Sequence, residues 1–277
     1  MIVWIIIATT SLISWQAFTN RNLFERYVFN PDRILRGGEW IRLIGSGFLH
    51  VNTMHLIFNM YAFYSFSWLL LAEMGEVGLA VIYFGSMVVG GLLSLLIHKN
   101  NSHYRAVGAS GAVSGVVYSS ILLYPNGGIG IILLPGSIDS WIFGLLFMAF
   151  SIYGIRSNRD NIGHEAHLGG AIAGVLITVI WFWGQGRIES WIIWTMLVPT
   201  VAFLLLLRYK PEWILPKTKS GFQVQMPTKF QGKRPPLSEN RQRELDRLLE
   251  KVNRVGINGL SIGERQRLED LRKYMDE

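Results

Sequence analysis

Three groups of polar residues lie within apolar stretches of the sequence, where polar side chains are costly and usually serve a function. Ser110 stands between glycines in the segment GASG, and His167 precedes two glycines in the segment HLGG. His55 and Asn59 are four residues apart, a spacing that puts both side chains on one face of a helix. A serine and a histidine that meet can act as nucleophile and base, because the imidazole removes the hydroxyl proton.

The glycines near the serine and the histidine predict how these two side chains meet. Gly111 with Gly115, and Gly170 with Gly174, form small-xxx-small patterns, which let membrane helices approach closely. We expect the two helices to pack through these glycines, so that the serine reaches the histidine.

The same residues predict a site for a developing negative charge. The side chains of His55 and Asn59, with the backbone N–H of Ser110, would donate hydrogen bonds to a tetrahedral oxyanion. Glu165 is the acidic residue nearest to the histidine in sequence, but residues two apart on a helix do not face each other. The sequence therefore predicts a Ser–His pair without a carboxylate.

Each group also has a simpler explanation when it is taken alone. Histidine and asparagine are residues that hydrogen-bond neighbouring membrane helices, and glycine pairs permit close packing whatever the function. A serine in a membrane helix commonly bonds a carbonyl of its own helix. The hydrolytic interpretation rests on the presence of all three groups in one chain.

Long apolar stretches carry these residues, and half of the 277 residues are hydrophobic. A helix that crosses a bilayer needs about 20 mostly apolar residues, and about 17 are tolerated. We therefore expect an all-α membrane protein, in which Ile129–Leu134 is a re-entrant or interfacial piece. The expected spanning helices are Ile2–Phe18, Met54–Ala72, Gly78–Ile97, Ala106–Tyr124, Trp141–Ile155, His167–Gly184 and Trp191–Leu207.

The first stretch follows Met1 without a basic segment and has no small-residue cleavage site, so we expect a retained helix. Residues 208–277 are polar, and within them Ser238 is placed to cap a helix, while Ser261 and Glu264 form an S-x-x-E capping box. A hairpin this small buries little surface of its own, which favours a docking or regulatory role over a catalytic one. The expected domains are a membrane domain 1–207 (core 1–185, extra helix 191–207), a linker 208–236 and a soluble helical hairpin 237–277.

The chain has a formal net charge of +7 and no cysteine. The absence of cysteine excludes disulfide, thiolate and Cys-ligated metal chemistry. Most of the positive charge lies in the polar tail, which favours a solvated or lipid-headgroup role over nucleic-acid binding. Seven helices would place every Lys and Arg except Arg187 on the side where the serine lies, and the positive-inside rule makes that side cytoplasmic.

Over about residues 1–185, the chain resembles the rhomboid family of intramembrane serine proteases. Four segments carry the resemblance in the family's order: GEWIRL with Arg42, FLHVNTMHLIFN with His50, His55 and Asn59, GASGAVSG with Gly108, Ser110 and Gly111, and EAHLGGAIAG with His167, Gly170 and Gly174. The resemblance implies a six-helix core, a Ser110–His167 dyad without aspartate, an oxyanion or substrate site at His55, Asn59 and Gly108, and no metal or cofactor. It also implies transmembrane protein substrates in a lipid bilayer and an active site that opens to the outside, against the charge rule. We expect a multi-pass protein of a bacterial cell (inner) membrane.

Two features depart from the family pattern. Ser114 stands where family members often have an aromatic residue that packs on the catalytic histidine, which predicts a more loosely held His167. The stretch at 191–207 adds a helix, as in the six-plus-one form. Two other functions remain open: a catalytically inactive, rhomboid-like factor that binds membrane proteins, and a solute transporter, which predicts internal repeats that we do not find.

Overall fold

The computed structural model describes residues 1–130, 136–157, 162–210, 239–255, 259–261 and 263–268. The chain divides into two compact units, Met1–Phe230 and Gln231–Glu277. Helices make up almost all of the regular structure described, so the expected all-α fold class is confirmed. Two helices, Thr53–His98 and His164–Trp181, are long and apolar enough to cross a membrane, and the first unit has further apolar helical segments of 10–17 described residues.

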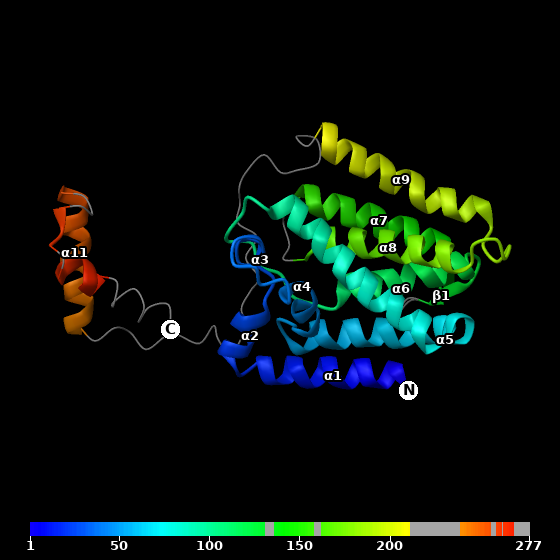
Figure 1. Ribbon diagram of the computed structural model, residues 1–277, viewed down its shortest axis with the longest axis horizontal. Coiled ribbons are helices and arrows are strands. Elements are labelled where there is room, and N and C mark those ends of the chain that lie inside the picture. The colour runs from blue at the N-terminus through cyan, green and yellow to red at the C-terminus, as the bar shows by residue number, and fades with distance from the viewer. Residues whose placement is uncertain (131–135, 158–161, 211–238, 256–258, 262, 269–277) are drawn as a thin grey trace. The chain divides into compact units, whose positions relative to one another are not determined.

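The helix α1 (Ile2–Ala17) packs along α5 (Thr53–His98) (Figure 1). The ring centroids of Trp4 on α1 and Tyr64 on α5 are 5.5 Å apart. Helix α5 contains a break at Gly75, whose φ of 68° and ψ of −174° are not helical. Glycine tolerates this backbone conformation because it has no Cβ. The break divides α5 into two helices, as the sequence predicted for 54–72 and 78–97.

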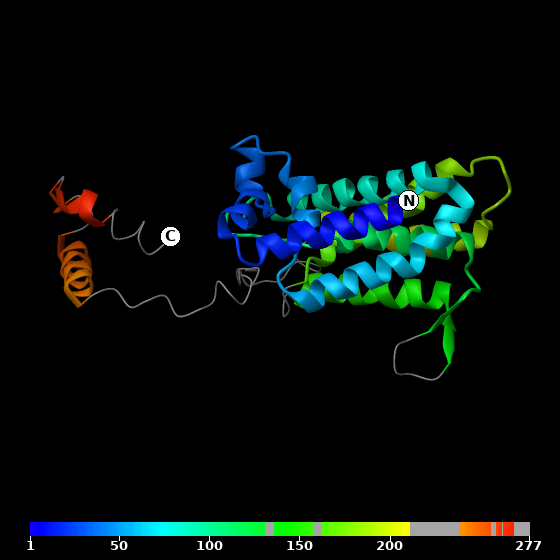
Figure 2. The ribbon, with the colours of Figure 1, turned by 90° about the horizontal axis from the view of Figure 1, so that it is seen from below.

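Among the described residues of the first unit, four further helices follow: α6 (Ser110–Leu123), α7 (Ser140–Ser157), α8 (His164–Trp181) and α9 (Ser190–Tyr209). Helix α6 begins at Ser110, later than the predicted Ala106, because Ala106 pairs as an isolated bridge with Phe29. Of the expected re-entrant piece Ile129–Leu134, residues 129 and 130 belong to the strand β1 (Gly128–Gly130), which pairs with β2 (Ser137–Asp139), and residues 131–135 lie outside the described residues. Figures 1 and 2 show this hairpin at the opposite end of the helices from α2–α4.

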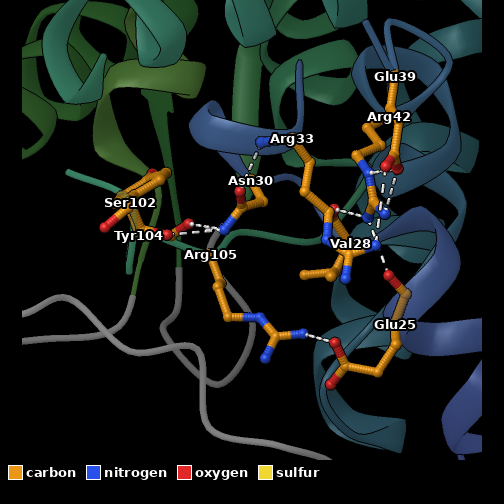
Figure 3. A network of polar contacts seen from close by, with 9 residues as sticks. All are labelled: Glu25, Val28, Asn30, Arg33, Glu39, Arg42, Ser102, Tyr104 and Arg105. Carbon is orange, nitrogen blue, oxygen red and sulfur yellow. Dashed lines mark hydrogen bonds and ion pairs between the residues drawn. The ribbon is translucent and has the colours of Figure 1, made fainter. Parts of the chain in front are cut away.

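The long segment between the first two spanning helices has a fold of its own, with α2 (Arg21–Tyr27), α3 (Pro31–Leu35), α4 (Arg42–Gly45) and the 3-10 turn η1 (Ser46–Phe48). Arg42 is only 1% exposed and holds this segment together. Its guanidinium donates to the carbonyls of Glu25 at 2.9 Å and Val28 at 2.7 Å, and pairs with the Glu39 carboxylate (Figure 3). Because a buried charge needs partners, Arg42 fixes α2 and α4 together.

A second set of contacts in Figure 3 ties the same segment to the loop before α6. Asn30 Nδ2 donates to the carbonyls of Ser102 at 2.9 Å and Tyr104 at 3.4 Å. Arg105 pairs with the Glu25 carboxylate. The loop that leads to Ser110 is therefore anchored on α2 and the start of α3.

Glycines bring α5, α6 and α8 into backbone contact. A Cβ added at Gly170 would lie 1.9 Å from the carbonyl oxygen of Gly111, and one at Gly174 would lie 2.3 Å from that of Gly115. One added at Gly90 of α5 would lie 2.6 Å from the carbonyl oxygen of Ala166. We call these contacts the glycine seam; they leave no room for a side chain between the three helices.

In the second unit, α11 (Glu239–Val255) buries Leu245 and Leu248 against Leu268. The predicted capping box is present, since Ser261 N–H donates to Glu264 Oε2 at 2.9 Å and Glu264 N–H donates to Ser261 Oγ at 3.3 Å. The Lys251 ammonium and Ser261 N–H lower the pKa of the Glu264 carboxyl to about 2. The predicted cap Ser238 and the linker from residue 211 onward lie outside the described residues.

The glycine seam predicts a difference between Gly170→Ala and Gly85→Ala. A methyl at 170 meets the backbone of α6, whereas one at 85 meets only the flexible Cδ1 end of Ile177, at 2.9 Å. Because overpacking costs about 1–3 kcal/mol, Gly170→Ala should lower the Tm of the detergent-solubilised protein. Gly85→Ala should leave the Tm near the wild-type value, and equal Tm values for the two variants would contradict the seam.

Candidate functional site

A cavity of about 410 Å3 lies at the end of the helices that carries the segment 19–53. Its lining comes from the segment 29–52, both halves of α5, the turn into α6 and its first residues, and the loop and first turn at the start of α8. All five residues predicted to do or to support chemistry contribute to this lining: Ser110, His167, His55, Asn59 and Gly108. The structure therefore brings together in one cavity residues that lie more than 100 positions apart in the sequence.

Ser110 is the first residue of α6, and the turn before it is tightly fixed. Gly108 has a φ of 130°, which side chains other than glycine rarely adopt, and its N–H donates to the Ser46 carbonyl at 3.0 Å. A Cβ at Gly108 would lie 2.8 Å from His55 Cε1 and 3.9 Å from Ser110 Oγ. His55 and the Ser110 hydroxyl therefore flank the same glycine.

His50, to which the resemblance assigned no role, links α1 to the turn before Ser110. The Ser14 hydroxyl donates to the Phe48 carbonyl at 2.8 Å, so its oxygen accepts the Nδ1–H of His50 at 2.9 Å. Nε2 of the same ring then accepts the Ala109 N–H at 3.4 Å. Burial lowers the pKa of His50 well below its usual range, which keeps the ring neutral. Nothing in the sequence around Ser14 pointed to this link from α1.

His167 lies on the first turns of α8 and is 7% exposed. The glycine seam sets its helix against α6, since a Cβ at Gly111 would lie 3.2 Å from the Ala166 carbonyl oxygen. The ring of Phe147 on α7 stacks on the imidazole, with centroids 5.5 Å apart and an interplanar angle of 25°. The expectation of a loosely held His167, based on Ser114, overlooked this ring because it comes from another helix.

His55 and Asn59 occupy the first two turns of α5, which Asn52 caps by accepting the His55 N–H at 2.8 Å. Asn59 is buried, and its Nδ2 donates to the His55 carbonyl at 2.9 Å. An amide nitrogen has two N–H donors, so one remains for a ligand. Nδ1 of His55 has no hydrogen-bond partner among the described residues.

Glu165 is buried beside His167 in the sequence, but its carboxylate belongs to another cluster. Oε1 accepts the Tyr104 hydroxyl proton at 2.5 Å and lies 2.6 Å from His98 Nε2, while the rings of Tyr104 and His98 are stacked at 3.6 Å. These contacts join the start of α8 to the end of α5. The carboxylate therefore points away from the cavity, as its spacing of two residues from His167 predicted.

The decisive comparison is with the model of the rhomboid domain, which matches residues 37–184 of this chain. The chain belongs to the rhomboid family. The match covers every residue that lines the cavity except Phe29, and the helices from α5 to α8, which are five when both halves of α5 are counted. Residues 238–273 match a second model, a family of unknown function named DUF6576, which covers α11 and the capping box.

Individual rhomboid relatives are similar over part of their length. Rhomboid protein 1, mitochondrial, of Saccharomyces cerevisiae is 32% identical over 139 residues, which are 49% of this chain and 40% of that protein. Presenilin-associated rhomboid-like protein A, mitochondrial, of Danio rerio is 27% identical and covers 66% of this chain and 46% of its own length. Rhomboid-like protein 11, chloroplastic, of Arabidopsis thaliana is 31% identical over 146 residues, which are 50% of this chain and 51% of that protein. This rhomboid chain thus aligns with about half the length of each.

The relatives correct one expectation from the sequence. The prediction of a bacterial cell membrane is wrong, because the rhomboid relatives are mitochondrial and chloroplastic proteins and point to an organellar membrane. The sequence motifs that predicted a rhomboid are shared by members of different compartments, so they carried no information about location.

Proposed function

We propose that the chain is an intramembrane serine endopeptidase that hydrolyses peptide bonds in or near the transmembrane segments of other proteins. The observation that supports this proposal is the shared cavity of Ser110, His167, His55, Asn59 and Gly108. A helix-packing role explains each residue singly, but it does not explain why all five line one cavity.

In the proposed reaction, His167 removes the proton of the Ser110 hydroxyl as the oxygen attacks the carbonyl carbon of the scissile bond. The peptide C–N bond then breaks, and the imidazolium gives its proton to the leaving amine. Water attacks the acyl-enzyme with the same histidine as base, which frees the carboxylate and restores the hydroxyl.

The oxyanion of each tetrahedral intermediate would lie beside Gly108, between the ring of His55 and the start of α6. The free N–H of Asn59, the Nε2 side of His55 and the backbone N–H of Ser110 are the proposed donors. Ser110 is the first residue of α6, and the N-terminus of a helix also favours negative charge.

The proposed organisation assigns the reaction to residues 1–207, with the rhomboid core in 1–185 and an additional helix at 191–207. The linker 208–236 and the hairpin 237–277 would serve a partner or a lipid headgroup, since no proposed catalytic residue lies there. The cavity lies at the end that carries the basic segment 19–53, so the orientation of that segment fixes the side from which the serine is reached.

The first test concerns the dyad. Because a hydroxyl is a weak nucleophile without its base, Ser110→Ala and His167→Ala should each abolish cleavage of a model transmembrane substrate. The double variant should be no worse than either single variant, since residues that act as a unit fail together. A Ser110→Ala protein that cleaves at the wild-type rate would instead favour an inactive, client-binding rhomboid with a contaminating protease.

The second test concerns the oxyanion donors. Loss of one such donor costs about 10²–10³ in rate, but the backbone N–H shares the load, so His55→Ala and Asn59→Ala should be slowed rather than inactive. Both should still react with a fluorophosphonate probe, because Ser110 and His167 are intact. If both single variants and the double variant turn over at the wild-type rate, the pair has only a packing role.

The third test concerns the tail. A chain truncated after Thr218 keeps α9 and its basic flank, and should insert and cleave the model substrate in detergent with kcat/KM near the full-length value. The reason is that the cavity is built entirely from residues of the first unit. A fall of more than tenfold would show that the hairpin is part of the catalytic machinery.

A further inference from the structure

We propose that Phe147 is a positioning residue that orients the imidazole of His167. In other serine hydrolases a carboxylate, or an aromatic ring on the helix that carries the serine, would do this. This inference rests on the proposed Ser110–His167 dyad and adds a third group to it. Its basis is the stacked contact between the two rings, 5.5 Å between centroids and 25° between planes. Aromatic rings at this separation attract each other in a preferred orientation.

The nucleophile helix supplies no ring at the corresponding place. Ser114 lies one turn after Ser110 on α6 and is 3% exposed, so a small hydroxyl fills that position. Glu165 is held by Tyr104 and His98 at the end of α5. Phe147, from α7, is thus the aromatic ring that covers the face of the imidazole.

The position of Phe147 is itself fixed by its neighbours. The ring of Phe143, one turn earlier on α7, stacks on it with an interplanar angle of 4°. The fully buried Tyr118 of α6 lies 6.3 Å from the Phe147 ring and donates its hydroxyl proton to the Gly144 carbonyl at 2.6 Å. This hydrogen bond joins α7 to α6, so the ring is held at a set distance from the helix that carries Ser110.

Such a ring has two consequences for a dyad. It limits rotation of the imidazole, so that the nitrogen that takes the serine proton stays directed at the hydroxyl. It also presents a π face to the imidazolium that forms when the proton is taken, and a cation within about 6 Å of a ring centroid is stabilised. Both effects act on the chemical step and leave substrate binding unchanged.

The test compares Phe147→Leu and Phe147→Tyr in the full-length protein, with a model transmembrane substrate. Leucine keeps an apolar side chain but has no π face, whereas tyrosine keeps the ring. We expect Phe147→Leu to lower kcat and the rate of fluorophosphonate labelling by about tenfold with KM unchanged, as a misplaced catalytic group does. Phe147→Tyr should keep kcat and the rate of fluorophosphonate labelling within about twofold of the wild-type values.

Phe150→Leu is the matched control, because Phe150 also lies on α7 and packs on an imidazole of α8, but on that of His164, at 5.0 Å. The His164 ring meets that of His167 edge-on, at 5.8 Å and 78°, so Phe150 does not itself cover a face of the His167 ring. Phe150→Leu should keep the wild-type kcat. If Phe147→Leu and Phe150→Leu lose kcat equally, and each loss of kcat follows a loss of Tm, the proposal is overturned and both rings only pack the helices. A wild-type kcat in Phe147→Leu would also overturn the proposal. Phe147→Met serves the same comparison if the leucine variant does not fold.

The positioning role and the proposed function fail in different ways. If Ser110→Ala still cleaves, the proposed protease is wrong whatever Phe147 does. If Ser110→Ala is inert while Phe147→Leu and Phe147→Met keep the wild-type kcat, the dyad stands and only the role of Phe147 is lost.

Discussion

Direct backbone contact between α5, α6 and α8 is the constraint on which the rest of the structure depends. Helices in a bilayer gain little from the hydrophobic effect and associate through close packing and hydrogen bonds. Here the packing is close enough that a methyl group at Gly170 would reach within 1.9 Å of a carbonyl oxygen of α6. The Ser119 hydroxyl adds a bond across the same contact, to the Gly174 carbonyl at 3.1 Å. Because this arrangement does not depend on flexible side chains, it holds the first turns of α6 and α8 in one position.

Around that rigid centre, several buried polar side chains form hydrogen bonds with neighbouring protein groups and not with the cavity. Arg42 is saturated by two carbonyls and a carboxylate, Glu165 by a tyrosine and a histidine, and Asn59 partly by its own helix. Burying a polar group without partners is costly, so each of these bonds stabilises the fold. His55 is one of several exceptions, because its Nδ1 is buried without a hydrogen bond among the described residues, beside the start of α6. Functional groups often retain such unsatisfied atoms.

The ends of α1, α7 and α9 fall within a few residues of the ends of the apolar stretches that predicted them. The agreement arises because the thickness of the bilayer sets the length of an apolar spanning helix. The sequence placed the start of α6 too early, since the bridge between Phe29 and Ala106 joins segments that lie far apart in the sequence. Of the predicted site residues that line the cavity, Ser110, His167, His55 and Asn59 were predicted from their types and spacing, and Gly108 from the resemblance to the rhomboid family. The contributions of Phe147 and Ser14 were not, because each acts through a contact between helices that no local pattern records.

Ser14 shows that a residue before the segment matched by the rhomboid domain also supports the candidate site. The rhomboid match begins at residue 37, yet the acceptor for the His50 Nδ1–H lies on α1, before that boundary. A chimaera joined at residue 37 to the first helix of another rhomboid would keep every residue that lines the cavity except Phe29. It would nevertheless lose the group that selects one tautomer of His50, and with it the lone pair that holds the Ala109 amide. A first helix taken from another rhomboid would therefore have to bring its own hydrogen-bond acceptor for the His50 Nδ1–H at the position of Ser14.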